Sequence, residues 1–277
     1  MDIALTSFGD SKQPRVCPET SLILRDEVEP GIIRLTLNRA DARNALSLEM
    51  IRQLMTQIES MAHDDQVRVV ILAGAGPAFC AGHDLKELRA NPTVDFHTKV
   101  FGLVGRLMLT ITDFQRPVIA EVQGIATAAG CQLVATADLA IAAEDARFAT
   151  PGVNIGLFCS TPMVALSRAV ASKHAMEMLL TGDMISAAEA QRMGLVNRVV
   201  PDDKLESVLD EMARTIAENA PLTVRCAKLV VGESLKDPTE RDLEACERAV
   251  EACFASNDYK EGQAAFMEKR KPKFIGA

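Results

Sequence analysis

Hydrophobic residues in the first part of the chain follow two spacings. Apolar and polar residues alternate in residues 22–26 and 32–37, and Pro30-Gly31 separates the two segments. Alternation is typical of strands with one buried face and Pro-Gly of a turn, so we expect an antiparallel pair. Residues 67–72 are instead a continuous β-branched run, which predicts a strand buried on both faces.

Two further short apolar runs, 118–122 and 139–142, also predict strands, although Glu121 interrupts the first. Helical spacing fills the intervals between them. Ser47 is a predicted cap for a helix whose apolar residues recur at i, i+3 and i+4 (Met50, Ile51, Leu54, Ile58 and Met61), and residues 128–136 form another predicted helix. Strands that alternate with helices predict an α/β layer arrangement.

Beyond residue 161 the spacing becomes helical, apart from a short strand expected at 195–200. Three helix starts are marked by a capping side chain and a later acid: Ser186 with Glu189, Asp237-Pro238 with Glu240, and Asp258 with Glu261. Residues 1–20 show no period and contain two prolines, which is typical of a flexible extension. We therefore predict an extension at 1–20, an α/β core at 21–200 and a helical C-terminal subdomain at 201–277.

Composition narrows the class of protein. The 277 residues include ten Phe, one Tyr and no Trp, so the core must be aliphatic, and the net charge of −8 argues against nucleic-acid and anionic-membrane partners. No apolar run approaches the roughly 18–20 residues that span a bilayer, and the acidic N-terminus resembles neither a secretory signal nor a transit peptide. Seven cysteines without a C-x-x-C pair indicate reduced thiols, a cytoplasmic location and no metal site.

Two segments combine a buried strand, a turn of small residues and a helix start. The first is F-C-A-G-H-D-L-K-E-L at 79–88, and the second is P-V-I-A-E-V-Q-G-I-A-T-A-A-G-C-Q-L at 117–133. Such turns expose backbone N–H groups ahead of a helix, where caps or water usually satisfy them and where an oxyanion also binds. Each segment alone is weak evidence because small-residue turns before helices are common.

Together these segments resemble the two signature segments of the enoyl-CoA hydratase/isomerase (crotonase) superfamily. Further matches are N-R-A-D-A-R-N-A-L at 38–46, A-M-E-M-L-L-T-G at 175–182, the pattern Ala187, Ala190, Gly194-Leu195-Val196, and A-F-M-E-K-R at 265–270. They occur in the family's order over residues 22–273. The resemblance implies a crotonase (ClpP-like) spiral fold of ββα units with a helical C-terminal subdomain that forms trimers or dimers of trimers.

The resemblance also implies a site. Its oxyanion donors are the backbone N–H groups of His83 and Ala129, which stabilise the carbonyl oxygen of an acyl-CoA thioester. Coenzyme A is then part of the substrate, and no cofactor is bound permanently. The residues expected to bind the substrate or its CoA are Arg39, Ala42, Arg43, Ala81, Asp84, Leu85, Phe266 and Lys269. The basic run Lys269, Arg270, Lys271 and Lys273 is either a solvated tail or a cationic patch for a phosphorylated ligand.

This chain departs from the hydratases at both catalytic glutamates. Gln132 stands at the first position and Gly152 at the second, and neither residue can transfer a proton near neutral pH. Residues 158–163, F-C-S-T-P-M, also replace the family's P-G-x-G-G-T segment. These features, with A-G-H-D-L-K-E-L and A-A-G-C-Q-L-V-A, are similar to a divergent branch of the family that has no evident pair of glutamates.

Several side chains are candidates to replace the missing pair. The His83 imidazole has a suitable ordinary pKa, Cys159 or Ser160 is a candidate nucleophile without a paired base, Asn154 is a candidate to orient water, and Glu121 is a candidate buried acid. Three functions stay open: an acyl-CoA enzyme of altered chemistry (isomerase, decarboxylase, thioesterase-like or weak hydratase), a CoA-ester-binding protein with little catalysis, and a conventional enoyl-CoA hydratase of fatty-acid metabolism.

Overall fold

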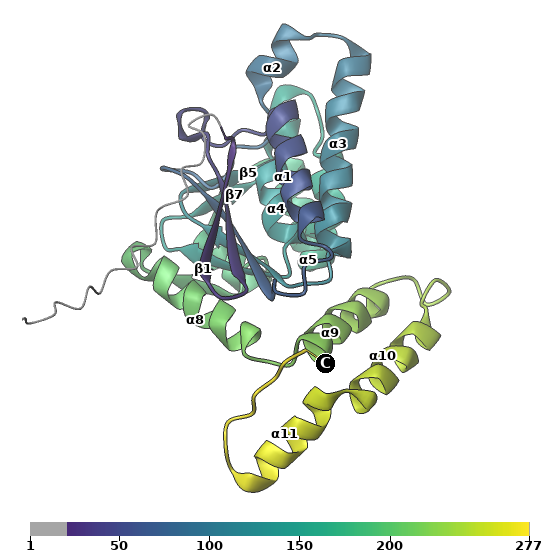
Figure 1. The fold of residues 1–277 in the computed structure, drawn as a ribbon. Coiled ribbons are helices and arrows are strands. Elements are labelled where there is room, and N and C mark those ends of the chain that lie inside the picture. The colour runs from purple at the N-terminus through teal and green to yellow at the C-terminus, as the bar shows by residue number, and fades with distance from the viewer. Residues whose placement is uncertain (1–20, 277) are drawn as a thin grey trace, which may run out of the picture.

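The computed structural model describes residues 21–276. The predicted extension at 1–20, and with it the expectation that the N-terminus is neither a signal nor a transit peptide, lies outside the described residues. Two sheets form the centre of the molecule (Figure 1). The larger has the strand order β1-β2-β3-β4-β6-β9, in which only β1 and β2 are antiparallel, and the smaller has the order β5-β7-β8.

The six strands of the larger sheet agree with the sequence patterns to within a few residues, whereas the three strands of the smaller sheet were not predicted. The strands are β1 (Ile23–Glu29), β2 (Ile32–Leu37), β3 (Val69–Gly74), β4 (Val118–Val122), β5 (Ile125–Thr127), β6 (Leu139–Ala143), β7 (Arg147–Ala149), β8 (Ile185–Ser186) and β9 (Arg198–Val200). The antiparallel pair around Pro30-Gly31 is confirmed, with Gly31 at a φ of 79° in the turn, where a residue other than glycine would be strained.

The helices are α1 (Leu48–Ser60), α2 (Leu85–Ala90), α3 (Val94–Asp113), α4 (Ala129–Thr136), α5 (Ser160–Ala169), α6 (Ser172–Thr181), α7 (Ala187–Met193), α8 (Leu205–Ala217), α9 (Pro221–Ser234), α10 (Leu243–Ala255) and α11 (Asn257–Glu268). Short 3-10 turns cover Ala40–Ala42, Pro151–Ile155 and Asp202–Lys204. Ser47 caps α1, as predicted, and its hydroxyl accepts the Met50 N–H. None of the helices between residues 21 and 276 is long and apolar enough to cross a membrane.

Side chains of the larger sheet alternate between two cores. Val70 and Leu72 of β3 join the core that contains α1, α3 and α4, whereas Val69 and Ile71 join a second core beneath α8. Figure 1 shows α8 on the face of the sheet away from α1 and α3. The continuous apolar run at β3 therefore reflects burial on both faces, as its sequence predicted.

The same alternation explains the acid in β4. Glu121 faces α8 and forms an ion pair with Arg34 of β2, whose guanidinium also lies 3.0 Å from Asp210 and 3.5 Å from Glu206. Burial raises the pKa of Glu121 to about 6 against the attraction of Arg34, and the carboxylates of Glu206 and Asp210 add to the rise. Glu121 is buried as expected, but on the face of the sheet opposite α4, so it does not reach the residues around Gln132.

Two of the three marked helix starts are wrong. The Ser186–Glu189 capping box is present, and Gly194 ends its helix with a φ of 91°. Asp237, however, accepts the N–H and hydroxyl of Thr239 in a turn, so α10 begins at Leu243 with Asp242 as its cap. At α11 the cap is Ser256, because the carboxylate of Asp258 accepts the N–H groups of Ile275 and Gly276.

The C-terminal helices leave much apolar surface uncovered. Helices α9, α10 and α11 lie to one side of the sheets (Figure 1), and α11 packs mainly on α10. Leu243, Val250 and Phe254 are 66%, 48% and 58% exposed. These three side chains, at helical spacing along α10, are therefore not buried against the core of their own chain. The six cysteines within residues 21–276 are free thiols.

Candidate active site

The two signature segments lie side by side. Beyond β3, residues 79–83 run parallel to residues 123–127: the Phe79 N–H donates to Gln123 O at 2.9 Å, the Cys80 N–H to Ile125 O at 3.0 Å, and the Thr127 N–H to Cys80 O at 3.0 Å. The Thr127 hydroxyl adds a bond to Ala81 O at 3.1 Å. This pairing brings the turn before α2 next to the turn before α4.

Small residues are necessary where the two turns meet. Gly82 has a φ of 89°, and a Cβ there would lie 2.8 Å from Thr127 O and 3.2 Å from Ala129 N. A Cβ on Gly130 would lie 2.1 Å from Cys80 O, which is far inside van der Waals contact. Neither position accepts a side chain unless the backbones separate, so the glycines set the distance between the turns.

Two backbone donors at this junction are free. The N–H groups of His83 and Ala129 have no hydrogen-bond acceptor among residues 21–276, whereas their neighbours are engaged: the Asp84 N–H donates to Leu46 O at 3.2 Å and the Ala128 N–H to Ala149 O at 2.9 Å. Ala129 is also the first residue of α4, where the helix dipole is positive. Such a pair of donors is suited to an oxygen that gains negative charge.

The turn that presents the second donor is strained. Ala128 has a φ of 51° and a ψ of −118°, a region that residues with a Cβ rarely occupy. Such a conformation costs about 1–3 kcal/mol and is typical of functional sites. It is held by the Ala128–Ala149 hydrogen bond on one side and the pairing of Thr127 with Cys80 on the other.

The His83 side chain is poorly suited to transfer protons near neutral pH. Its ring stacks on Phe101 of α3, with 4.2 Å between ring centroids and 17° between planes. Its Nε2 is buried without a partner in the described residues, and burial lowers its pKa to about 4. The imidazole is therefore neutral and a weak base near neutral pH, and its position is set by a neighbour, not by solvent.

Gln132 and Gly152, which the family resemblance aligns with two glutamates of hydratases, are both buried. The Gln132 amide oxygen accepts the Thr161 hydroxyl at 3.1 Å. A Cβ on Gly152 would lie 3.0 Å from both the N and the Sγ of Cys159, so a side chain at that position requires residues 158–159 to move. Residues 158–159, which precede α5, thus occupy the space that a side chain at position 152 would need.

The other nucleophile candidates are poorly activated. Burial raises the pKa of the Cys159 thiol, and it raises that of the neighbouring Cys131 to about 12. Both are thiols, not thiolates, near neutral pH, so neither is a nucleophile at rest. Ser160 is the first residue of α5, and its hydroxyl has no hydrogen bond to any base within residues 21–276. Asn154 is exposed and packs against Gly182.

Six of the predicted substrate-binding residues gather around one loop. Arg39 pairs with Asp84 at 2.6 Å and donates to Ala45 O, and Ala42 lies in the 3-10 turn that follows Arg39. Asp84 caps α2 by accepting the N–H groups of Lys86 and Glu87; burial raises its pKa, but Arg39 and these donors outweigh burial, so the pKa stays below its usual value. The contacts of Arg39 and Asp84 therefore stabilise this loop and the start of α2.

Of the other five residues of the predicted set, three complete the group around this loop and two lie elsewhere. The Ala81 N–H donates to Arg43 O, while the Arg43 and Leu85 side chains are exposed at the surface. Phe266, 82% exposed, and Lys269 lie at the end of α11, away from this loop (Figure 1). The structure of one chain does not bring α11 to the loop around Arg39.

Three residues of the site had not been assigned a role. Asn44 is fully buried, and its side chain accepts the Arg39 N–H and donates to Ala75 O and Ala78 O, so it holds the loop in place. Its place in the N-A-L motif was the available clue. Phe101 comes from a helix for which no pattern was identified, and nothing in the sequence pairs Thr161 with Gln132.

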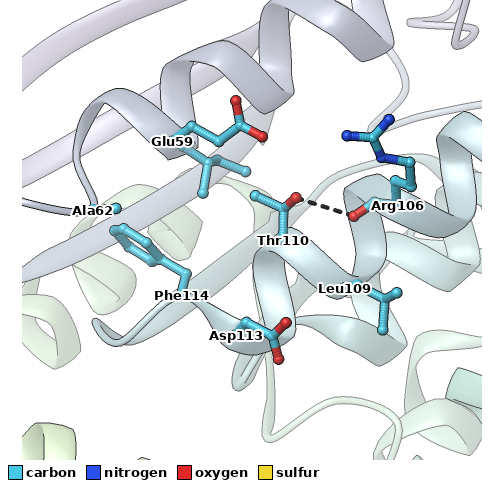
Figure 2. A pocket seen from close by; sticks show the side chains of 8 residues that line it. Glu59, Ala62, Arg106, Leu109, Thr110, Asp113 and Phe114 are labelled. Carbon is cyan, nitrogen blue, oxygen red and sulfur yellow. Dashed lines mark hydrogen bonds between the residues drawn. The ribbon is translucent and has the colours of Figure 1, made fainter.

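A hollow of about 370 Å³ lies elsewhere, between the C-terminal ends of α1 and α3. Figure 2 shows Glu59, Arg106, Thr110 and Asp113 around it, and the Thr110 hydroxyl donates to the carbonyl of Arg106 in its own helix. The N–H groups of His83 and Ala129 lie instead beside the N-terminal end of α1, where the Asp84 N–H donates to Leu46 O. This hollow is therefore separate from the candidate active site.

Comparison with known proteins agrees with the motifs. The sequence profile of the family described as enoyl-CoA hydratase/isomerase matches residues 27–277. A rat protein named enoyl-CoA hydratase domain-containing protein 3, mitochondrial, is 42% identical over 95% of this chain and 86% of its own length. The Xenopus laevis protein of the same name is 45% identical over 88% of this chain and 83% of its own. These relatives represent the divergent branch that the motifs indicated.

Solved structures give the same fold. An enoyl-CoA hydratase of Mycobacterium smegmatis is 45% identical, covers 92% of this chain and 99% of its own, and has a TM-score of 0.87. The human enoyl-CoA hydratase domain-containing protein 3 is 41% identical, with coverage of 92% and 100% and a TM-score of 0.86. The predicted crotonase fold, an α/β core followed by C-terminal helices, is confirmed.

The same comparison corrects the predicted location. Vertebrate relatives at 41–45% identity carry "mitochondrial" in their names, so the prediction of a cytoplasmic protein is wrong. The inference rested on reduced cysteines, and free thiols indicate a reducing environment without identifying the compartment.

Proposed function

This chain belongs to the enoyl-CoA hydratase/isomerase family, and we propose on that basis that it binds an acyl-CoA thioester and polarises the thioester carbonyl between the N–H groups of His83 and Ala129. The observation that carries the proposal is the junction of the two turns, where these donors lack an acceptor within residues 21–276. Coenzyme A enters as part of the substrate, and no permanently bound cofactor takes part.

The chemistry follows from where charge develops. An enolate or a tetrahedral intermediate of a thioester places negative charge on the former carbonyl oxygen, and two N–H groups held in place stabilise that charge without reorganising. Each such donor contributes roughly 3–4 kcal/mol to the lowering of the barrier. Because both donors are backbone groups, this capacity does not depend on the residues at 132 and 152.

Ordinary hydration is not part of the proposal. Adding water across an enoyl double bond needs groups that take a proton from water and return one to carbon, and each contributes about 10²–10⁴-fold. The Gln132 amide does not titrate, Gly152 has no side chain, and the His83 ring has a pKa of about 4. We therefore expect an acyl-CoA enzyme of altered chemistry that hydrates crotonyl-CoA slowly at best.

The alternative is a protein that binds CoA esters with little catalysis. It is favoured by the high pKa values of Cys131 and Cys159, which leave no activated nucleophile beside Gln132. A scan of acyl-CoA thioesters with product analysis by mass spectrometry, run beside calorimetric binding, separates the two: binding without any product supports the alternative.

The direct test is crotonyl-CoA hydration by the wild type and by Gln132→Glu. Glutamate has the shape of glutamine and can keep the bond from Thr161, so we expect turnover to rise by about 10²-fold. Gln191→Glu, the same change at an exposed position, is the matched control and should have no effect. A wild-type turnover of about 10 s⁻¹ or more would show that the loss of the glutamates has been misread.

Restoring the second glutamate is harder. Gly152→Glu places a Cβ 3.0 Å from Cys159 N and Sγ, and overpacking of this kind costs about 1–3 kcal/mol. We expect the double variant Gln132→Glu, Gly152→Glu to melt at a lower temperature than Gln132→Glu and to gain little further hydration.

A further inference from the structure

A second concave site lies at the amino ends of β3 and β4, at the opposite end of these strands from His83 and Ala129. Its volume is about 260 Å³. The loops that precede the two strands form one wall, and the end of α8, the first turn of α9 and the tail at Ile275–Gly276 form the other. It is therefore separate from the proposed thioester site.

The pocket is lined by three arginines and one carboxylate: Arg68, Arg116, Arg225 and Asp65. Two positive charges are left over, although the whole chain carries a net charge of −8. Two more carboxylates lie nearby, Asp64 bonded to the Gln66 N–H and Asp258 to N–H groups of the tail; both keep their negative charge, and that of Asp64 acts on Arg116. A cationic hollow in an acidic protein requires an explanation beyond general surface charge.

Arg116 is a fixed part of this hollow. It is 4% exposed, and its guanidinium donates to Ala62 O at 2.7 Å, Asp64 O at 3.1 Å, Val67 O at 3.4 Å and the Asp65 carboxylate at 3.3 Å. These bonds hold the charge in one place. Burial lowers the pKa of Arg116 and the charges of Arg225 and Arg68 add to the lowering, whereas the carboxylates of Asp65 and Asp64 oppose it.

Arg68 and Arg225 are engaged far less. The Arg68 guanidinium has no hydrogen-bond or ion-pair partner within residues 21–276, and it lies 3.7 Å from the Cβ position of Gly276 on the opposite wall. Arg225 has only Asp65, at 3.6 Å, and that carboxylate is 83% exposed and shared with Arg116. Both guanidinium groups thus keep N–H donors available to a molecule in the hollow.

We infer that this arginine pocket (Arg68, Arg116, Arg225) binds a phosphate-type dianion, either inorganic phosphate or the phosphate of a small phosphorylated metabolite. The planar forks of guanidinium groups match phosphate oxygens in pairs, and a dianion balances the two unmatched charges. A bound dianion joins α9 to the loop that precedes β3.

The test is calorimetric binding of inorganic phosphate and of pyrophosphate to the full chain, with chloride and acetate at the same ionic strength as references. We expect phosphate and pyrophosphate to bind and to raise the Tm above that in chloride, because a ligand that binds only the folded state stabilises it. Phosphate that binds no better than chloride or acetate would overturn the inference.

Variants locate the site. Arg68→Gln and Arg225→Gln should each weaken phosphate binding by about tenfold or more, and Arg68→Lys, which keeps the charge but not the fork, should lie between. Arg192→Gln, the same charge change at an exposed position on α7, is the control. Arg116 is left intact because its bonds to three carbonyls support the fold.

The two sources of the ligand are told apart by competition. If a small phosphomonoester such as glycerol phosphate displaces phosphate from the wild type, and not from Arg68→Gln, the pocket is assigned to phosphorylated metabolites. If no ester displaces phosphate, the pocket is assigned to inorganic phosphate. Crotonyl-CoA binding should be the same in all variants. Wild-type phosphate affinity in both Arg68→Gln and Arg225→Gln would refute the assignment.

Discussion

One methyl group added at Gly82 should disable the proposed oxyanion site while leaving its donors in the chain. In Gly82→Ala the new Cβ would lie 2.8 Å from Thr127 O, 2.9 Å from the Ala128 Cβ and 3.2 Å from Ala129 N. The first two distances are shorter than real Cβ contacts, so the turns must move apart. His83, which follows Gly82, then loses its position relative to Ala129.

The size of the effect depends on the state of the thioester. A neutral carbonyl gains about 0.5–1.5 kcal/mol from one hydrogen bond, so the affinity for crotonyl-CoA should fall by roughly threefold to tenfold. An oxygen that carries negative charge depends more on its donors, so any turnover should fall by about 10²–10³-fold. Free CoA has no carbonyl at this position and should bind the variant as it binds the wild type.

The matched control is Gly156→Ala. Gly156 also has a positive φ, 73°, but a Cβ there would have no atom within 4 Å. Both variants therefore carry the left-handed strain of about 1–2 kcal/mol, and only Gly82→Ala carries the clash. Calorimetry with crotonyl-CoA and free CoA, and infrared spectroscopy of a ¹³C-labelled thioester carbonyl, measure the outcome. Wild-type affinity and carbonyl shift in Gly82→Ala would refute the proposed donors.

Three further predictions concern other parts of the chain. The raised pKa of Glu121, about 6, means that the folded state holds this proton more tightly than the unfolded state. The resulting contribution to the free energy of unfolding is complete below pH 4.5 and is lost as pH rises through 6. Urea titrations should therefore show the free energy of unfolding falling over this pH range in the wild type and not in Glu121→Gln. The family resemblance and the 58% exposure of Phe254 predict a trimer-based oligomer by light scattering, which Phe254→Asp should weaken; a stable 29.9 kDa wild-type monomer would contradict this. The double variant Lys269→Glu, Arg43→Glu should bind CoA esters about tenfold more weakly at low salt, with a smaller difference at high salt, and unchanged affinity at low salt would count against these contacts.

Hydrophobic spacing predicted the elements that carry the site but not all their neighbours. The strands β3 and β4 and the helices α1 and α4 follow from periodicity, because a side chain's face is decided by its own position along the element. The helix α3 was not predicted, and with it the stacking of Phe101 on His83 was missed. Nothing in the segment around His83 reveals which ring will cover it.

Capping patterns failed where a carboxylate had a better partner. Asp258 and Glu261 have the right spacing for a cap, but Asp258 accepts two N–H groups of the returning tail and Glu261 pairs with Arg270. A spacing rule counts only donors within one turn of the chain, whereas the fold supplies others from 17 residues away. Thr161 and Gln132 illustrate the same limit, since 29 residues separate them.

The surroundings of the two free donors favour chemistry that leaves proton transfer to water or to the substrate. Burial lowers the pKa of His83 to about 4 and raises that of Cys131 to about 12, so each keeps one charge state across the neutral range. Gln132 with Thr161 supplies a neutral pair at the position where the family resemblance leads us to expect an acid in hydratases. A carboxylate there would repel an anionic acyl group, and the neutral amide does not. Under the proposed function, we therefore expect a neutral residue at 132 both to remove hydration and to admit negative charge beside the proposed donors, a combination that suits thioesters whose reaction needs a stabilised enolate more than it needs a base.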